Sequence, residues 1–173
     1  VEQIVRLARA ETHGVVFVHL AGNPSGLRDV RRWAEQHDPS TDWRRGFVLE
    51  DAAHALPARL DGPFSDMIGK SPWACAFSFY ATKTLSCSEG GMITTEDAAL
   101  AERLRTMACH GVDRDAYQRS RTALSHYDVV EEGYKANLPD LLAALGRSQL
   151  ARQEVLHARR CWIAARYRNT LTH

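Results

Sequence analysis

Residues 78–91 read SFYATKTLSCSEGG, an apolar segment that passes through a single lysine into a turn rich in serine and glycine. The aromatic residues before Lys83 belong to a run that starts at Ala74, and this run predicts a buried strand that ends just before the lysine. Met92 to Thr94 predicts a second strand, which the Gly90-Gly91 turn returns to the sheet. Lysine is normally solvated, so its place after a buried strand indicates a charged tip that faces a cavity.

The segments before this turn predict a strand, a helix and a strand in succession. Val15 to Leu20 is apolar and β-branched, and the turn Ala21-Gly22-Asn23-Pro24 closes it. Residues 26–37 carry apolar side chains at helical spacing, and residues 46–49 form a second short apolar strand. A strand–helix–strand unit of this length predicts a parallel sheet.

The segments after the turn predict helices and one long loop. Residues 96–109 predict a helix with Thr95 as its N-cap. A final helix is expected to begin near Pro139 and to continue to the end of the sequence. Residues 111–133 are polar and aromatic and predict a loop that reaches away from the core. Before the turn, residues 57–72 show no convincing periodicity, and a structureless stretch of that length is often functional.

Composition narrows the class of protein. The 173 residues are 45% hydrophobic and 25% charged, which is typical of one soluble globular domain. The formal net charge is +1, so there is no electrostatic reason to expect nucleic acid or a membrane surface as a partner. No apolar run approaches the ~20 residues that cross a bilayer. The four cysteines form no CxxC pair, which argues against a zinc ribbon or a disulfide scaffold and favours a reducing cytoplasm.

Two residues of opposite charge follow predicted strands. Asp51 follows the strand Phe47 to Glu50, and Lys83 follows the strand that starts at Ala74. Ligands of open α/β sheets bind outside the carboxyl ends of the strands, so both residues point toward the expected crevice. A desolvated lysine can form a Schiff base, and an aspartate can pair with a pyridinium nitrogen, as in pyridoxal phosphate (PLP) enzymes. Spacing alone leaves open that both are ordinary turn residues or solvated charges.

The residues around Asp51 and Lys83 decide between these interpretations. VLEDAAHALPA (48–58), FSFYATKTLSCSEGGMITT (77–95) and GYKANLPDLLAALGRSQL (133–150) resemble, in order and spacing, the DegT/DnrJ/EryC1/StrS family. The stretch VHLAGNPSGL (18–27) is similar to the upstream strand and turn of that family. The resemblance implies the large α/β domain of the PLP-dependent transferase type I fold (aspartate aminotransferase-like), with a mostly parallel sheet and flanking helices.

The resemblance assigns roles residue by residue. It implies that Lys83 forms the Schiff base with PLP and then shuttles a proton, and that Asp51 pairs with the pyridine nitrogen. His54 corresponds to a position beside the PLP ring and its hydroxyl. The alternative is a histidine that hydrogen-bonds only to other protein groups behind the site and does not touch the cofactor. Ser78 corresponds to a serine that binds the cofactor phosphate. Asn137 corresponds to an asparagine that reaches the phosphate from the neighbouring subunit of a homodimer.

By the same resemblance, the chain is expected to be part of an aminotransferase. The implied reaction transfers an amino group to a keto sugar, and the keto sugars of this family are mostly nucleotide-linked. L-Glutamate is the expected donor of the amino group. Residues 1–173 are expected to form only part of the PLP-binding catalytic domain, without the N-terminal phosphate-binding segment and the small C-terminal domain. Within the family pattern, Ala136 replaces an aromatic residue.

Two alternatives stay open at this point. Some relatives are PLP-dependent deoxysugar dehydratases, but these replace the lysine by histidine, so Lys83 favours transamination. The second alternative is a truncated remnant that has no catalytic activity.

Overall fold

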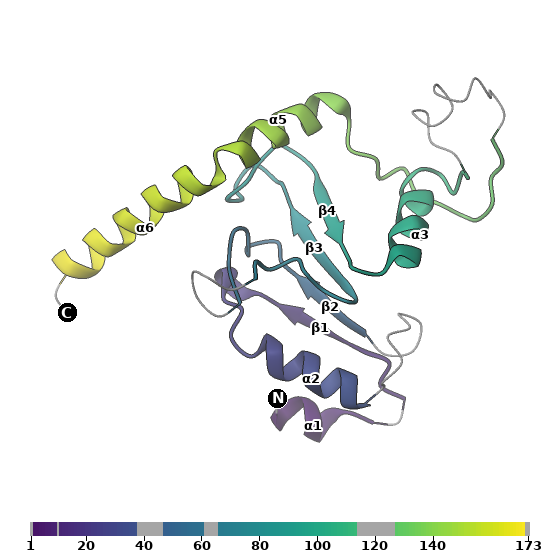
Figure 1. Cartoon of the computed structure of the whole chain (residues 1–173), viewed down its shortest axis with the longest axis horizontal. Coiled ribbons are helices and arrows are strands. Elements are labelled where there is room, and N and C mark those ends of the chain that lie inside the picture. Colours follow the sequence, from purple (N-terminus) through teal and green to yellow (C-terminus); the bar gives the residue numbers. More distant parts are fainter. Residues whose placement is uncertain (1, 10, 38–46, 61–65, 114–126, 172–173) are drawn as a thin grey trace.

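The computed structural model describes residues 2–9, 11–37, 47–60, 66–113 and 127–171. Its secondary structure elements follow one another along the chain as shown in Figure 1. They are α1 (Glu2–Leu7), β1 (Gly14–Val18), the short 3-10 helix η1 (Leu20–Gly22), α2 (Leu27–His37), β2 (Phe47–Asp51), β3 (Ala74–Ser78), β4 (Gly91–Thr94), α3 (Ala98–Ala108), α5 (Asp140–Ala151) and α6 (Gln153–Thr170).

The four described strands form one sheet in the order β1-β2-β3-β4. The strands β1, β2 and β3 are parallel, and β4 returns antiparallel to β3. This confirms the parallel strand–helix–strand unit that the sequence predicted. In this register Asp51 lies between Val18 of β1 and Ala76 of β3, and Ser78 lies opposite Gly91 of β4. The carboxyl ends of β1, β2 and β3 therefore meet at one edge of the sheet.

One face of the sheet carries the core, and we call it the α2 face. Side chains alternate between the two faces of a strand, and Val48 and Glu50 of β2 are both fully buried against α2. Leu27 and Val30 of α2 and Cys75 of β3 complete the centre of this cluster. The opposite face carries Asp51 and Ser78, together with the exposed side chains Val16 and Val18 of β1 and Ile93 of β4.

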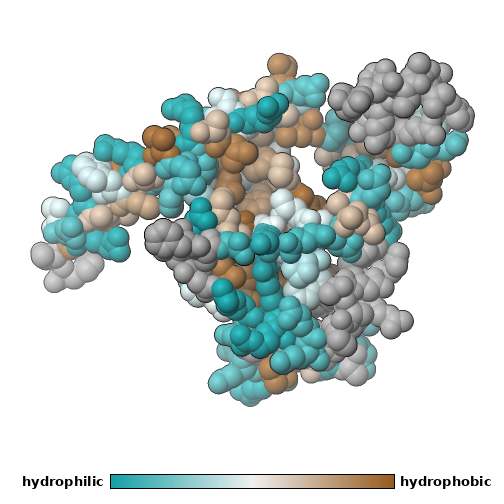
Figure 2. Space-filling model, in the orientation of Figure 1, coloured by the Kyte–Doolittle hydropathy of each residue, from teal (hydrophilic) through white to brown (hydrophobic). Residues whose placement is uncertain are grey.

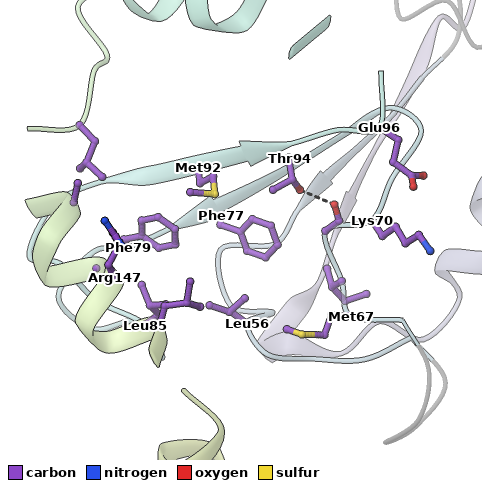
Figure 3. A pocket seen from close by; sticks show the side chains of 16 residues that line it. Leu56, Met67, Lys70, Phe77, Phe79, Leu85, Met92, Thr94, Glu96 and Arg147 are labelled. Carbon is purple, nitrogen blue, oxygen red and sulfur yellow. Dashed lines mark hydrogen bonds between the residues drawn. The ribbon is translucent and has the colours of Figure 1, made fainter. Parts of the chain in front are cut away.

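A second apolar cluster joins the sheet to the C-terminal helices. Phe79, Leu85 and Cys87 are buried there against Leu138 and Leu142. Beside it, an apolar groove of about 730 Å³ runs along Phe77 and Met92 (Figure 3). Apolar surface gathers around the hollow below α5 in Figure 2. Helix α6 continues from α5 as an arm that points away from the sheet (Figure 1).

The boundaries of the elements differ from the predicted ones at the helix starts and strand ends. Thr95 is not the cap of α3: Asp97 is, and its carboxylate accepts hydrogen bonds from the N–H groups of Ala99 and Leu100. The C-terminal pattern forms two helices rather than one, with the break at Arg152. In the described part of the chain, no helix is both long enough and apolar enough to span a bilayer.

Candidate active site

Asp51 is the last residue of β2 and points to the opposite face from the core. Its side chain is half-buried, and its Oδ1 accepts a hydrogen bond of 3.0 Å from the backbone N–H of Ala53. This bond begins the turn after the strand and fixes the carboxylate, a local pattern that aspartate favours at such positions. Its second oxygen, Oδ2, can accept a hydrogen bond from a ligand at the sheet edge.

Lys83 and His54 meet across the two turns that follow β3 and β2. Their side chains lie 2.8 Å apart, measured from Lys83 Nζ to His54 Nε2. The side-chain hydroxyl of Thr84 also donates to the backbone oxygen of Leu56, which ties the two turns together a second time. The sequence placed both residues after strands, but it did not predict their contact. The structure brings an amine and an imidazole together at the edge where Asp51 lies.

The turn that carries Lys83 is held on both sides. The backbone N–H of Lys83 donates to the carbonyl oxygen of Tyr80 at 2.9 Å. Leu85, two residues later, is buried in the second apolar cluster. Arg160 of α6 donates to the carbonyl oxygen of Thr84 at 3.3 Å. Packing and hydrogen bonds therefore fix where the backbone presents the lysine, although the side chain itself is only half-buried.

Ser78 joins this group, whereas Asn137 does not contact it. Ser78 ends β3 on the same face as Asp51, and its Oγ accepts a hydrogen bond of 3.3 Å from the N–H of Tyr80. Asn137 is exposed and lines a groove between α3 and the opposite face of β3 and β4. Within the described part of the chain, no hydrogen bond joins Asn137 to Asp51, His54 or Lys83.

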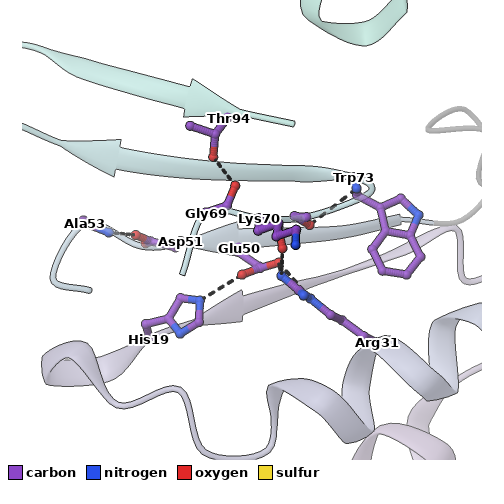
Figure 4. A network of polar contacts seen from close by, with 10 residues as sticks. His19, Arg31, Glu50, Asp51, Ala53, Gly69, Lys70, Trp73 and Thr94 are labelled. Carbon is purple, nitrogen blue, oxygen red and sulfur yellow. Dashed lines mark hydrogen bonds and ion pairs between the residues drawn. The ribbon is translucent and has the colours of Figure 1, made fainter. Parts of the chain in front are cut away.

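Next to Asp51 lies a buried polar network that sequence reasoning missed (Figure 4). Glu50 is fully buried, and its carboxylate oxygens bind His19 Nε2 at 3.2 Å and Arg31 Nε at 3.1 Å. Arg31 also donates through Nη2 to the carbonyl oxygen of Lys70 at 3.0 Å. The signal was present in the sequence: Glu50 occupies a core position of an apolar strand, two residues after Val48, and a buried charge requires partners.

The partners of Glu50 outweigh the cost of its burial. Burial by itself raises the pKa of the Glu50 carboxyl, because the charged form loses water. Hydrogen bonds from His19 and Arg31, with the positive charge of Arg31, act in the other direction, and the pKa ends below its ordinary value of 4.5. Glu50 is therefore ionised in the folded protein at neutral pH.

The donor set at the sheet edge fits PLP, the cofactor that the resemblance implies. PLP presents an aldehyde, a pyridine nitrogen, a ring hydroxyl and a phosphate. The edge offers an amine that can bond to the aldehyde (Lys83) and a carboxylate that can pair with the pyridine nitrogen (Asp51). The imidazole of His54 and the hydroxyl of Ser78 suit the ring hydroxyl and the phosphate. All four residues lie at the carboxyl ends of neighbouring parallel strands, where ligands of α/β sheets bind.

Known proteins resemble the chain over nearly its whole length. The model of the DegT/DnrJ/EryC1/StrS aminotransferase family matches residues 1–173. The spore coat polysaccharide biosynthesis protein SpsC of Bacillus subtilis is 42% identical over 157 residues, which cover 90% of this chain and 38% of SpsC. Of the solved structures, the sugar aminotransferase CalS13 from Micromonospora echinospora is 30% identical with a TM-score of 0.80, covering 97% of this chain and 43% of CalS13.

A further solved structure with the same fold contains a reaction intermediate. DesV of S. venezuelae, solved in complex with a ketimine intermediate, is 31% identical with a TM-score of 0.78, covering 95% of this chain and 39% of DesV. The chain spans about two fifths of the length of the curated relatives that it matches, 38% to 41%. Aminotransferases of the matched family depend on PLP. The match over all 173 residues and the shared fold show that the chain belongs to the DegT/DnrJ/EryC1/StrS aminotransferase family.

Proposed function

We propose that the protein containing this chain is a PLP-dependent aminotransferase that transfers an amino group from L-glutamate to a nucleotide-linked keto sugar. The observation that carries the proposal is the contact of 2.8 Å between Lys83 and His54 at the sheet edge that also holds Asp51. Similarity to SpsC and CalS13, a polysaccharide biosynthesis protein and a sugar aminotransferase, supports a sugar substrate.

Each residue of the site has a task that its position supports. Lys83 would bind the cofactor covalently and then move a proton at the substrate carbon, and His54 Nε2 lies close enough to exchange a proton with Lys83 Nζ. Asp51 would keep the pyridine nitrogen protonated: the bond from the N–H of Ala53 to Oδ1 fixes its carboxylate, and Oδ2 can accept from the ring nitrogen. Ser78 would hold the phosphate. When bound, PLP supplies an electron-withdrawing ring that accepts the negative charge that develops on the substrate.

The proposal extends to parts that lie outside this chain. Asn137 is exposed, and no hydrogen bond of the described structure joins it to the other four residues. Both observations suit a residue that completes the phosphate site of a partner subunit in a homodimer. A phosphate-binding segment before residue 1 and a small domain after residue 173 would complete the subunit. A remnant without these parts would have the residues of the site but no activity.

The test is to locate PLP on the protein. The chain has three lysines, Lys70, Lys83 and Lys135, so the full-length protein is incubated with PLP, reduced with borohydride, digested and mapped by mass spectrometry. Borohydride reduces the carbon–nitrogen double bond between lysine and PLP and makes the link permanent. We expect the label on the Lys83 peptide and the PLP absorbance band to disappear in Lys83→Ala.

The two other lysines of this chain provide matched controls. Lys70→Ala and Lys135→Ala should keep both the PLP absorbance band and the label on Lys83, because neither lysine lies at the sheet edge. Lys70 pairs with Asp66 at 3.5 Å, and Lys135 lies in the exposed segment before α5. Label spread evenly over the three lysines, or equal in folded and urea-unfolded protein, would contradict the proposed function.

A further inference from the structure

Glu50 and Asp51 are consecutive carboxylates that serve opposite faces of the sheet. Because side chains alternate along a strand, Glu50 points into the α2 face and is fully buried, whereas Asp51 points to the opposite face at the proposed cofactor site. Whatever fixes Glu50 also fixes the backbone from which Asp51 projects. The inference below rests on the proposed function, since it concerns how that site is held in place.

His19 connects the carboxylate of Glu50 to the backbone of Asp51. Its ring Nε2 donates to Glu50 Oε2 at 3.2 Å, and its backbone N–H donates to the carbonyl oxygen of Asp51 at 3.0 Å. The ring is buried, and its Nδ1 has no hydrogen-bond partner among the described residues. The bond to Glu50 is thus the one described hydrogen bond that orients the ring. Loss of that bond would leave both ring nitrogens of this buried residue without a described hydrogen-bond partner.

The turn after His19 reaches the second part of the site. Gly22 of η1 has a φ of +80° and lies so close to the turn after β2 that an added Cβ would stand 2.7 Å from the carbonyl oxygen of His54. Only glycine allows this approach without strain. His19 therefore anchors a turn that contacts Asp51 by a hydrogen bond and His54 by close packing.

Arg31 completes the network from the helix side. Its guanidinium donates to Glu50 Oε1 through both Nε and Nη2, whereas His19 binds the other oxygen, Oε2. Charge-assisted hydrogen bonds to both oxygens therefore hold the carboxylate in one orientation. The same guanidinium holds the carbonyl oxygen of Lys70. Figure 4 shows Arg31 and His19 approaching Glu50 from two different segments. Helix α2, strand β2 and the turn after β1 thus meet in one buried set of charge-assisted bonds.

We propose that Arg31, Glu50 and His19 are positioning residues for the cofactor site: they hold the Asp51 carboxylate and the His54 turn in the geometry that binds the PLP ring. They do not touch the cofactor themselves. The network transmits the orientation of α2 to the end of β2, and from there to the two side chains that would contact the ring and its hydroxyl. Partners of this kind, one shell behind the groups that bind, are what keeps a site from becoming loose.

The experiment compares three variants in the full-length protein. His19→Ala removes the link but leaves Arg31 paired with Glu50, and His19→Gln returns an amide donor to the region of Nε2. Val48→Ala is the matched control, because Val48 is fully buried on the same face of β2 but makes no part of the network. For each protein, the Kd for PLP, the pH dependence of the absorbance of bound PLP and the urea midpoint are measured.

A positioning role predicts a pattern that general destabilisation does not produce. We expect His19→Ala to weaken PLP binding by about tenfold or more, by analogy with the loss seen when hydrogen-bond partners of metal-binding side chains are removed. The pH at which the absorbance of bound PLP changes should shift with it, and His19→Gln should recover most of both effects. Val48→Ala should lower the urea midpoint and leave the Kd and the absorbance profile as in the parent protein.

Three results would overturn the inference. If His19→Ala binds PLP as tightly as Val48→Ala of comparable stability, the network is a structural support for β2 alone. If His19→Ala does not fold, Arg31→Lys serves in its place, because it keeps the charge but loses the forked contact with Glu50, and an unchanged Kd and spectrum in that variant would have the same meaning. A parent protein that binds no PLP at all would instead reject the proposed function, and the inference with it.

Discussion

At the scale of single residues, Glu50 shows how a charge is kept inside the protein. Water is replaced by Arg31 and His19, and the hydrogen bonds that they make keep the carboxylate ionised in spite of its complete burial. Arrangements of this kind are costly to break, because removal of one partner leaves the other buried without compensation. The side chain of Arg31 is only 18% exposed, so little water is available to replace Glu50.

The pKa of Glu50 leads to a prediction for stability against pH. Because the folded-state pKa lies below the unfolded value, the contribution of Glu50 is complete above that unfolded value, near 4.5, and is lost as the pH falls through the folded-state pKa. We expect Glu50→Gln to be less stable by roughly 3 kcal/mol at neutral pH. The difference from the parent should stay constant down to about pH 4.5 and shrink as the pH falls further, through the folded-state pKa.

Urea unfolding at a series of pH values measures this difference. Asp29→Asn is a suitable control, since Asp29 pairs with Arg32 on the exposed side of α2 and its carboxylate is more than half exposed. Such surface pairs contribute at most about 1 kcal/mol. A gap between Glu50→Gln and the parent that also stays constant as the pH falls below about 4.5 would show that the charge of Glu50 does not stabilise the fold.

The residues of the site differ in how far the sequence could predict them. Lys83 and Asp51 could be placed at one sheet edge, because strand ends are marked by apolar runs that stop at polar residues. The contact between Lys83 and His54 could not be predicted, because it depends on how the turns after β2 and β3 fold over the edge of the sheet. Glu50 could be placed at the end of an apolar strand, but only the register of β2 shows which partners meet its side chain in the core.

At the scale of elements, the start of α3 shows where local rules compete. Threonine and aspartate are both good N-cap residues, and the sequence analysis placed the cap at Thr95. In the structure, Thr95 Oγ1 instead accepts a hydrogen bond from the N–H of Asp97 at 3.0 Å. The Asp97 carboxylate then caps the helix. The threonine thus stabilises the turn that places Asp97 at the N-cap. A search that considers each N-cap residue by itself does not detect this arrangement.

The cap makes a clear prediction. Asp97→Ala should lower the free energy of unfolding by about 1 kcal/mol, because the N–H groups of Ala99 and Leu100 lose their acceptor. Asp97→Asn should lose less, since asparagine is itself a good cap. Thr95→Ala should cost less than Asp97→Ala in urea unfolding, and the reverse order would show that the helix starts at Thr95 after all.

At the scale of the whole molecule, α2 packs against one face of the sheet, whereas the opposite face is exposed over β1 and part of β4 in the described structure. Val16 and Val18 of β1 are 61% and 53% exposed, and Ile93 of β4 is 48% exposed. Parallel strands are normally buried on both faces, and the chain spans about two fifths of the length of its curated relatives. We propose that other parts of the full-length protein cover this face, next to the edge that carries Asp51 and Ser78.

The substitution Val16→Asp in the full-length protein distinguishes a covered from an exposed face. A charge at a covered position has no partner and should cost more than about 3 kcal/mol, the size of other uncompensated buried charges. On an exposed face, only the poor strand preference of aspartate remains, which amounts to about 1 kcal/mol. Val16→Thr separates the cost of a buried charge from the cost of a poor strand preference, because threonine keeps the β-branched shape and strand preference and adds only a hydroxyl. If Val16→Asp and Val16→Thr differ by about 1 kcal/mol or less in urea unfolding, the face lies open in the full-length protein as well.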